Sequence, residues 1–242
     1  MEYMQTRFWE VDFARGLAVI AMVLFNWLFA LHYFGLLENF DASQGFWWLF
    51  ARTTAFAFVF IAGVAVWLAF SRKDKEKLLR HGVKIFACGM LVTIATAFFL
   101  KSGFVVFGIL HSIGFSLILA LPLLRLGVER LSVLAFALIG SGVLLSGLRF
   151  DFPWLLWLGF VPNGFLSLDY FPLLPWFGVF VLGVCAGKNF YPNGKRAFRF
   201  EAIPPLAGPL SFLGRHSLAV YLLHQPLLAA VLFALGLNPL GL

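Results

Sequence analysis

The sequence predicts an all-α polytopic membrane protein with about seven transmembrane helices, and two observations carry this fold class. Hydrophobic residues make up 62% of the 242 residues and charged residues 12%, a composition that excludes an ordinary soluble fold. The apolar residues also gather in runs of about 20, the helix length that crosses the hydrocarbon core of a bilayer. We therefore expect one transmembrane domain over residues 1–242.

The apolar runs give the predicted spans, and the basic residues between them give the orientation. We place the spans at residues 12–36, 46–70, 82–100, 104–124, 129–148, 170–188 and 210–236. Lys and Arg gather on one side of this arrangement, and loops rich in them remain in the cytoplasm. We therefore expect the N-terminus inside and the C-terminus outside a cell membrane. The broken aromatic segment 148–169 is expected to form a re-entrant or interfacial lid.

Charge and cysteine content narrow the function classes. The net charge of +7 lies in predicted cytoplasmic loops, where topology and anionic lipids account for it, so nucleic acid is not expected. Cys88 and Cys185 stand alone in apolar spans and are interpreted as core side chains. The sequence shows no metal-type ligand spacing, no Gly-rich phosphate loop and no dinucleotide fingerprint. We predict no metal site.

The first span carries polar residues that a simple anchor would lack. A charged residue inside a transmembrane helix costs roughly 2.5 to 3.5 kcal/mol. Asp12 and Arg15 are three residues apart, so they are neighbours on a helix and can neutralise each other. Arg15, Asn26 and Tyr33 share one helix face. This face either packs through hydrogen bonds against other helices or lines a site.

Four polar residues from different spans are predicted to share one depth in the membrane. A helix rises 1.5 Å per residue, which places Asn26, Arg52, His111 and His224 in the outer third of the bilayer. A lone intramembrane His is often only a hydrogen-bonding residue, and Arg52 could instead reach the surface. Together the four predict a cavity. A neutral His can accept a proton from an acceptor while Asn and Arg stabilise an oxyanion, which is the chemistry of acyl transfer.

Several motifs also resemble a known family. The segments are VDFARGLAVIAMVLFNW, FVFIAGVAVWLAF, FGILHSIGFSLILALP and SLAVYLLHQP. Together they resemble the heparan-alpha-glucosaminide N-acetyltransferase catalytic-domain family, one group of transmembrane acyltransferases. The segment SLDYFPLLPWFG is similar to the small prokaryotic members.

The resemblance implies transfer of an acyl group, often acetyl, from acyl-CoA across the membrane to an acceptor, often a sugar, on the outer side. It also implies a catalytic His just beyond the first span and an Asn within that span. Asn26 matches this Asn, and His32 is the nearest counterpart of the His, although it follows Asn26 sooner than in the family. His224 matches a His in the last span, and His111 stands where Gln is usual.

The resulting candidate residues fall into three groups. The predicted catalytic residues are His32, Asn26, His224 and His111, with either His32 or His224 as the base. The predicted substrate-binding residues are Arg52, Gln225, Asp169 and Tyr221. The residues predicted to bind the acyl-CoA donor are Asp12, Arg15, Lys84 and Arg215.

Two other functions fit the same polar layer. A transporter or a lipid- or solute-binding membrane protein would bind its ligand there without turnover, although no inverted repeat is evident. A structural subunit would use the polar residues for packing alone. Membrane lipids and acyl-CoA are the expected partners, the acceptor is unidentified, and a homodimer that shares the donor path is left open.

Overall fold

The computed structural model describes residues 8–33, 35–71, 75–100, 102–199 and 205–237. Over these residues it contains eight α-helices, two short 3-10 helices and no β-strand, so the predicted all-α class is confirmed. Six of the described helices are long and apolar enough to cross a membrane. A further helix, α4, is apolar but has 15 residues. The chain is a polytopic helical membrane protein.

The described chain divides into two compact units. The first unit contains Met1–Phe58 and Phe200–Leu242, and the second contains Val59–Arg199. Helix α2 (Gly45–Ser71) begins in the first unit and continues in the second. The prediction of one domain over the whole chain stays a prediction.

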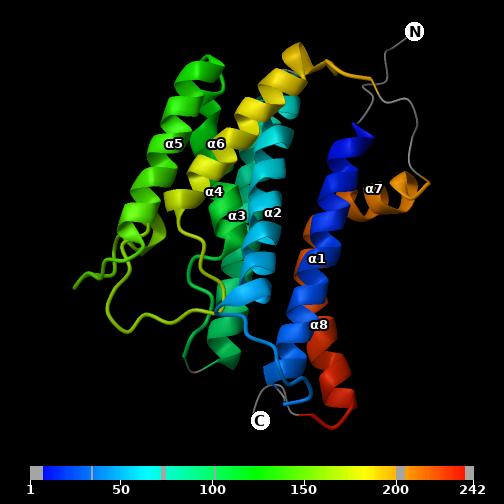
Figure 1. Cartoon of the computed structure of the whole chain (residues 1–242), viewed down its shortest axis with the longest axis vertical. Coiled ribbons are helices and arrows are strands. Elements are labelled where there is room, and N and C mark those ends of the chain that lie inside the picture. The colour runs from blue at the N-terminus through cyan, green and yellow to red at the C-terminus, as the bar shows by residue number, and fades with distance from the viewer. Residues whose placement is uncertain (1–7, 34, 72–74, 101, 200–204, 238–242) are drawn as a thin grey trace. The chain divides into compact units, whose positions relative to one another are not determined.

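In the first unit, α7 (Ala207–Arg215) crosses the start of α1 (Trp9–Tyr33), and α8 (Ser217–Ala234) then runs parallel to α1 (Figure 1). The direction follows from two hydrogen bonds. Ser211 Oγ donates to Trp9 O near the start of α1, and Gln225 Nε2 donates to Asn26 Oδ1 further along it. The predicted last span, 210–236, is divided at His216, whose φ of −102° and ψ of 15° interrupt the helix.

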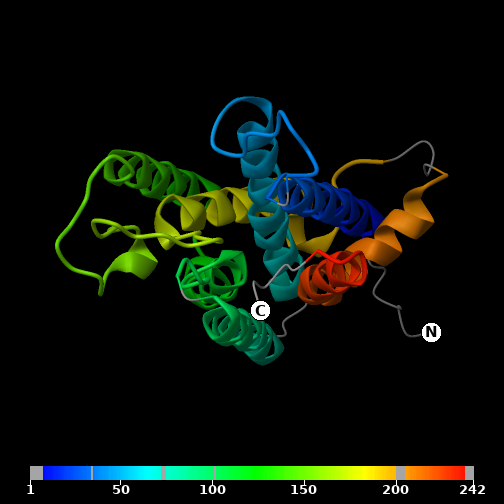
Figure 2. The same cartoon turned by 90° about the horizontal axis from the view of Figure 1, so that it is seen from below.

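The second unit pairs α3 (Lys75–Phe99) with α4 (Ile109–Leu123), and α5 (Val128–Leu145) with α6 (Leu173–Phe190). Figure 2 shows these helices from below. Glycine lets the backbones approach closely where helices cross. At Gly63 a Cβ atom would collide with Phe180 O, and at Gly183 it would collide with Phe60 O.

The predicted lid is largely irregular. It contains the 3-10 helix η1 (Leu156–Leu158) and an isolated bridge between Phe150 and Pro162. Its last residues hydrogen-bond to the loop before α4, because Leu168 N donates to Gly103 O at 2.8 Å and Phe171 N donates to Phe107 O at 2.8 Å. This pairing holds the loop in extended form. It explains why α4 begins at Ile109 and not at residue 104, where the span was predicted to start.

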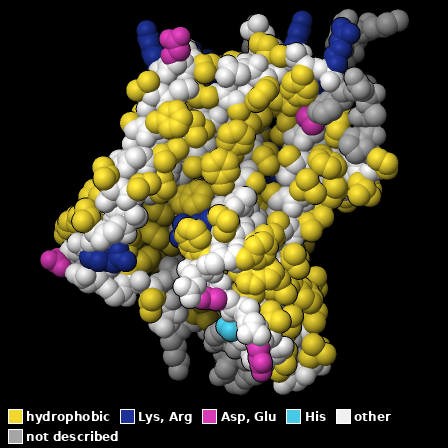
Figure 3. All heavy atoms as spheres, viewed as in Figure 1, with side chains coloured by type: hydrophobic (Ala, Val, Ile, Leu, Met, Phe, Trp, Pro, Cys, Tyr) yellow, Lys and Arg dark blue, Asp and Glu magenta, His cyan; other side chains and the backbone are white. Residues whose placement is uncertain are grey.

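The helix surfaces are those of a membrane protein. Hydrophobic side chains dominate the face of the molecule shown in Figure 3. Large apolar residues are exposed along the helices, such as Phe98 at 83% and Leu144 at 78%. In water such surfaces would aggregate, whereas in a bilayer they contact lipid. The protein is integral to a membrane, and the cell membrane stays a prediction.

Candidate active site

The ion pair predicted near the start of α1 is present. Arg15 Nη1 donates to Asp12 Oδ1 at 3.1 Å. Asp12 is buried, and it lies in the first turn of α1, where the helix dipole favours a carboxylate. Mutual neutralisation lowers the cost of placing both charges in an apolar segment.

Helix α7 packs against this part of α1 through small residues. A Cβ atom added to Gly214 would collide with Asp12 O, and one added to Gly16 would collide with Leu210 O. Ser211 Oγ donates to Trp9 O at 3.0 Å. The backbone contact buries Asp12 and leaves Arg215, at the end of α7, exposed.

Asn26 and Gln225 join α1 to α8. Gln225 Nε2 donates to Asn26 Oδ1 at 2.8 Å, and Asn26 Nδ2 donates to Met22 O at 2.9 Å. The two bonds fix the carboxamide of Asn26 from both ends. Because the amide nitrogen carries two hydrogens, the second N–H is left as a donor for another acceptor.

His224 lies beside Gln225, on the buried stripe of α8 that continues with Leu228 and Leu232. Its Nδ1 is 2.6 Å from Tyr221 O. A carbonyl only accepts hydrogen bonds, so Nδ1 carries the proton and Nε2 has the lone pair. His224 Nε2 is buried and has no hydrogen-bond partner among the described residues. A polar atom in this state is costly unless something binds it.

Pro226 and Tyr221 shape the surroundings of His224. Pro226 lies inside α8 and lacks the N–H that would bond one turn back. The ring of Tyr221 meets the ring of His224 edge to face at 5.6 Å. Tyr221 therefore contacts the imidazole through both its ring and its carbonyl.

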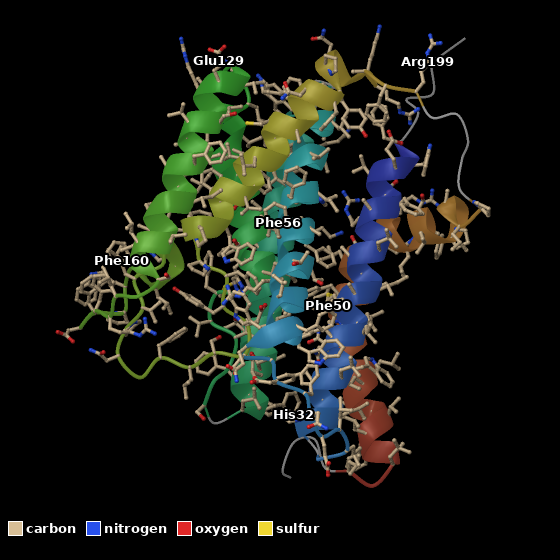
Figure 4. The ribbon with its side chains drawn as sticks, viewed as in Figure 1. His32, Phe50, Phe56, Glu129, Phe160 and Arg199 are labelled. Atoms are coloured by element: carbon tan, nitrogen blue, oxygen red, sulfur yellow. The ribbon has the colours of Figure 1, made fainter. Side chains whose placement is uncertain are left out.

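His32 lies at the end of α1, where Figure 4 labels it. The helix closes at Gly35, whose φ is 71°, and Leu36 N donates to Leu31 O at 2.9 Å. His32 is exposed, its Nδ1 lies 2.9 Å from Leu37 O, and its ring is 5.6 Å from that of Phe40. Phe40 is the buried centre of an aromatic cluster. Its other members are Phe25, Phe29 and Trp47.

Two charged groups lie near this end of the first unit. Hydrogen bonds from the side chain and backbone of Ser43 lower the pKa of Asp41 below its ordinary value. Arg52 is exposed, and its guanidinium stands 5.6 Å from the centre of the Trp48 ring. The surface and interior alternatives for Arg52 both stay predictions.

His111 belongs to the second unit and is buried, at 1% exposure. Its Nδ1 accepts a hydrogen bond from Gly108 N at 3.2 Å, and its Nε2 lies 3.4 Å from Thr93 Oγ1. The rings of Phe86 and Phe107 pack on the imidazole. His111 thus caps the first turn of α4, and both its ring nitrogens have partners.

Asp169 contacts the same helix start. Its Oδ2 accepts a hydrogen bond from Ile109 N at 3.0 Å, a favourable place for a carboxylate. Ser167 Oγ donates to Phe104 O and Asp169 O, each at 3.0 Å. The capping role of Asp169 carried no signal in the sequence, because the residue that it caps is sixty positions away.

The structure therefore brings together some candidates and not others. Asn26 and Gln225 meet between α1 and α8, and His224 and Tyr221 contact each other on α8, while Asp12 and Arg15 lie further toward the start of α1. His111 and Asp169 share the start of α4 in the second unit, and Lys84 is exposed on α3. The single membrane layer predicted for Asn26, Arg52, His111 and His224 stays a prediction. The described residues contain no group of three or more His, Cys, Asp or Glu side chains placed to hold a metal.

Comparison with known proteins gives one match. The model of the family described as heparan-alpha-glucosaminide N-acetyltransferase, catalytic, matches residues 7–226. No curated protein and no solved structure matches the chain. The matched range extends from before α1 to Pro226 and so includes both partners of the Asn26–Gln225 hydrogen bond, and His224. The chain belongs to the heparan-alpha-glucosaminide N-acetyltransferase catalytic-domain family.

Proposed function

We propose that this membrane protein transfers an acetyl group from acetyl-CoA to a hydroxyl or amine acceptor, of which a sugar at the outer side is the first candidate. The family match indicates a membrane acetyltransferase, for which acetyl-CoA is the donor in general. The acceptor and the side on which it is modified are part of the proposal.

The observation that carries the proposal is the state of His224. Its Nδ1 is occupied by Tyr221 O, and its buried Nε2 has no partner among the described residues. A neutral imidazole held in this tautomer can take a proton at Nε2. We therefore assign the base to His224.

In the proposed reaction, the acceptor O–H or N–H gives its proton to His224 Nε2 as the oxygen or nitrogen attacks the thioester carbonyl carbon. The carbonyl oxygen becomes an oxyanion, and the second N–H of Asn26 Nδ2 donates to it. Collapse breaks the C–S bond, and the proton passes from His224 to the leaving thiolate. Removing one oxyanion donor typically costs about 100- to 1,000-fold in rate.

Gln225 positions Asn26 in this scheme. Its bond to Asn26 Oδ1 fixes the orientation of the Asn26 carboxamide, whose nitrogen donates to Met22 O. Tyr221 fixes the His224 tautomer through its carbonyl. Arg52, exposed over Trp48, is assigned to acceptor binding at the membrane surface.

The donor is proposed to enter from the end of α1 that holds Arg15. Arg15 and Asn26 are eleven residues apart, about 16 Å along a helix, which suits a donor whose phosphates and thioester are well separated. Lys84 and Arg215 are exposed and basic and are assigned to phosphate attraction. The parallel course of α1 and α8 supports an odd number of crossings, and the N-terminus is proposed to lie in the cytoplasm.

The test is acetyl transfer by purified protein in nanodiscs. Acetyl-CoA labelled in the acetyl group is supplied with hexosamines and simple alcohols, and both labelled product and released CoA are measured. The expected result is acceptor-dependent CoA release that falls at least about 100-fold in Asn26→Ala.

Two results would overturn the proposal. One is the absence of acetyl-CoA binding by calorimetry in folded protein. The other is acetyl transfer that is unchanged in both Asn26→Ala and His224→Ala, since the site would then lie elsewhere.

A further inference from the structure

Residues 146–172, which connect α5 to α6, expose large apolar side chains although most of the segment is not helical. The exposed residues are Leu148, Trp154, Trp157, Leu166 and Leu168. Trp154 is 70% exposed and lies nearly flat on Phe152, with ring centres 5.2 Å apart. In water, a connection between two helices would be expected to carry polar residues at such positions.

This segment lies beside the α3–α4 pair and not beyond its end. The Trp157 ring contacts Phe115 of α4 at 5.9 Å, and Phe115 contacts Phe86 of α3 at 6.1 Å. Phe86 is thirteen residues from the Phe99 end of α3, about 20 Å along the helix. Trp157 therefore lies at a level well short of that end.

Lipid must reach at least as far as the Phe99 end of α3. The last turns of α3 expose Ile94 at 62% and Phe98 at 83%. Contact with acyl chains makes such exposure favourable. Any part of the second unit between this level and Phe86 lies within the thickness of the bilayer.

The neighbouring helices are too short to fill this thickness. Helix α4 has 15 residues, and α5 and α6 have 18 each. At 1.5 Å per residue they measure about 22 and 27 Å, against about 30 Å of hydrocarbon. The connecting segment therefore begins close to the boundary of the hydrocarbon core.

Several backbone groups of the irregular segment are hydrogen-bonded within it. Phe150 N donates to Val161 O at 3.1 Å, and Leu158 N donates to Leu155 O at 3.0 Å. Tyr170 Oη donates to Leu156 O at 2.7 Å. Two further backbone bonds, described above, join the segment to the loop before α4.

We propose that residues 148–168 form a layer embedded in the bilayer interface, with lipid as the partner of its exposed aromatic face. Phe152, Trp154 and Phe160 stack together, and Figure 4 places Phe160 at the opposite end of α5 from Glu129. Asn163 Nδ2 donates to Asp151 Oδ1 at 3.0 Å, and both residues are exposed. These polar tips lie among the headgroups while the rings enter the acyl region, the arrangement that Trp adopts at membrane interfaces.

The test measures which phase each tryptophan contacts. The protein, which has eight Trp residues, is labelled with 5-fluorotryptophan and placed in nanodiscs of phosphatidylcholine and phosphatidylglycerol. The variants Trp154→Phe, Trp157→Phe and Trp176→Phe assign three fluorine signals by their loss. The probes are a nitroxide on the lipid acyl chain and a gadolinium chelate in water.

The expected result is that the acyl-chain nitroxide broadens the Trp154 signal strongly and the gadolinium chelate does not. Trp176, which is buried at 6% exposure, is the internal control and should respond to neither probe. Because each assigning variant removes one signal, the remaining signals report whether the fold is retained. Broadening of Trp154 by the chelate alone would overturn the proposal and would leave its ring free for a ligand in water.

Discussion

Two buried histidines, His224 in the first unit and His111 in the second, differ in what their ring nitrogens contact. His224 gives its Nδ1 proton to Tyr221 O and leaves Nε2 without a described partner. His111 receives the Gly108 N–H at Nδ1 and faces Thr93 with Nε2. The two imidazoles are therefore opposite tautomers.

This difference makes His224 available for proton transfer, whereas His111 caps the start of α4. Both histidines lie deep in apolar surroundings, with exposures of 7% and 1%, so burial alone does not distinguish them. The two are distinguished by how many of their ring nitrogens have a hydrogen-bond partner. A base needs an unoccupied lone pair, whereas a cap uses its lone pair in the resting structure.

The largest effect is expected for His224→Gln. Removing a general base typically lowers the rate of the chemical step by about 100-fold or more. Gln retains the size and polarity of the side chain, so the folded state should persist. Steady-state acetyl transfer gives kcat, and thermal unfolding in detergent gives stability. If stability fell and kcat per folded molecule did not, His224 would be a structural residue like His111.

For His111→Ala we expect a loss of stability with little loss of activity. This change removes the cap of α4 and leaves a cavity between Phe86 and Phe107, which together should cost about 2 to 4 kcal/mol of stability. Activity per folded molecule should stay near that of the unaltered protein. Thermal unfolding in detergent measures the loss.

The matched variant is His111→Gln. Gln at the third helical position can accept the same backbone hydrogen bond, as in a capping box, and Gln is the residue that the family resemblance associates with this position. We expect it to recover most of the lost stability. A low stability in both variants would show that ring packing, and not the cap, is what His111 supplies.

A smaller effect is expected for Gln225→Ala. The change removes the hydrogen bond that orients Asn26, so kcat should fall about 10-fold, the equivalent of 1.4 kcal/mol. Gln225→Glu offers no N–H to Asn26 Oδ1, so it should not restore kcat. In both variants the KM for acetyl-CoA should stay nearly unchanged. Combining Gln225→Ala with Asn26→Ala should cost no more than Asn26→Ala alone. Strict additivity in that double-mutant cycle would show that Gln225 does not act through Asn26.

The smallest effect is expected for His32→Ala. His32 is exposed, and its contacts are with Leu37 O and the Phe40 ring. We expect kcat within about threefold of the unaltered protein, because the proton transfer is assigned to His224. A loss as large as that of His224→Gln would move the base to His32, the residue implied by resemblance to the first-span motif.

The sequence predicted the fold from composition and periodicity, and these were sufficient for the helices. It did not predict the break at His216 or the late start of α4, since both depend on partners distant in the chain. Apolar residues 104–108 look helical in isolation, but hydrogen bonds to residues 168 and 171 keep them extended. Local patterns contain no information on such pairings.

The candidate site was predictable as a set of residue types and not as an arrangement. Span depth suggested that Asn26 and His224 could meet, yet it did not show which helices are neighbours. Gln225 was expected to bind substrate. Its hydrogen bond to Asn26 depends on α8 lying beside α1, which the sequence does not show. The tautomers of His111 and His224 could not be predicted, because a tautomer depends on the hydrogen-bond partners of the ring.

The parallel contact between α1 and α8 has a consequence for biosynthesis. Asn26 and Gln225 are 199 residues apart in the chain, so the first helix must wait in the membrane until the last one has been inserted. Closing so long a loop is slow, and no local contact can substitute for it. A nascent chain that stops before α8 could bury much of its apolar surface in lipid and still lack half of the proposed site. Activity would then appear only in the completed protein.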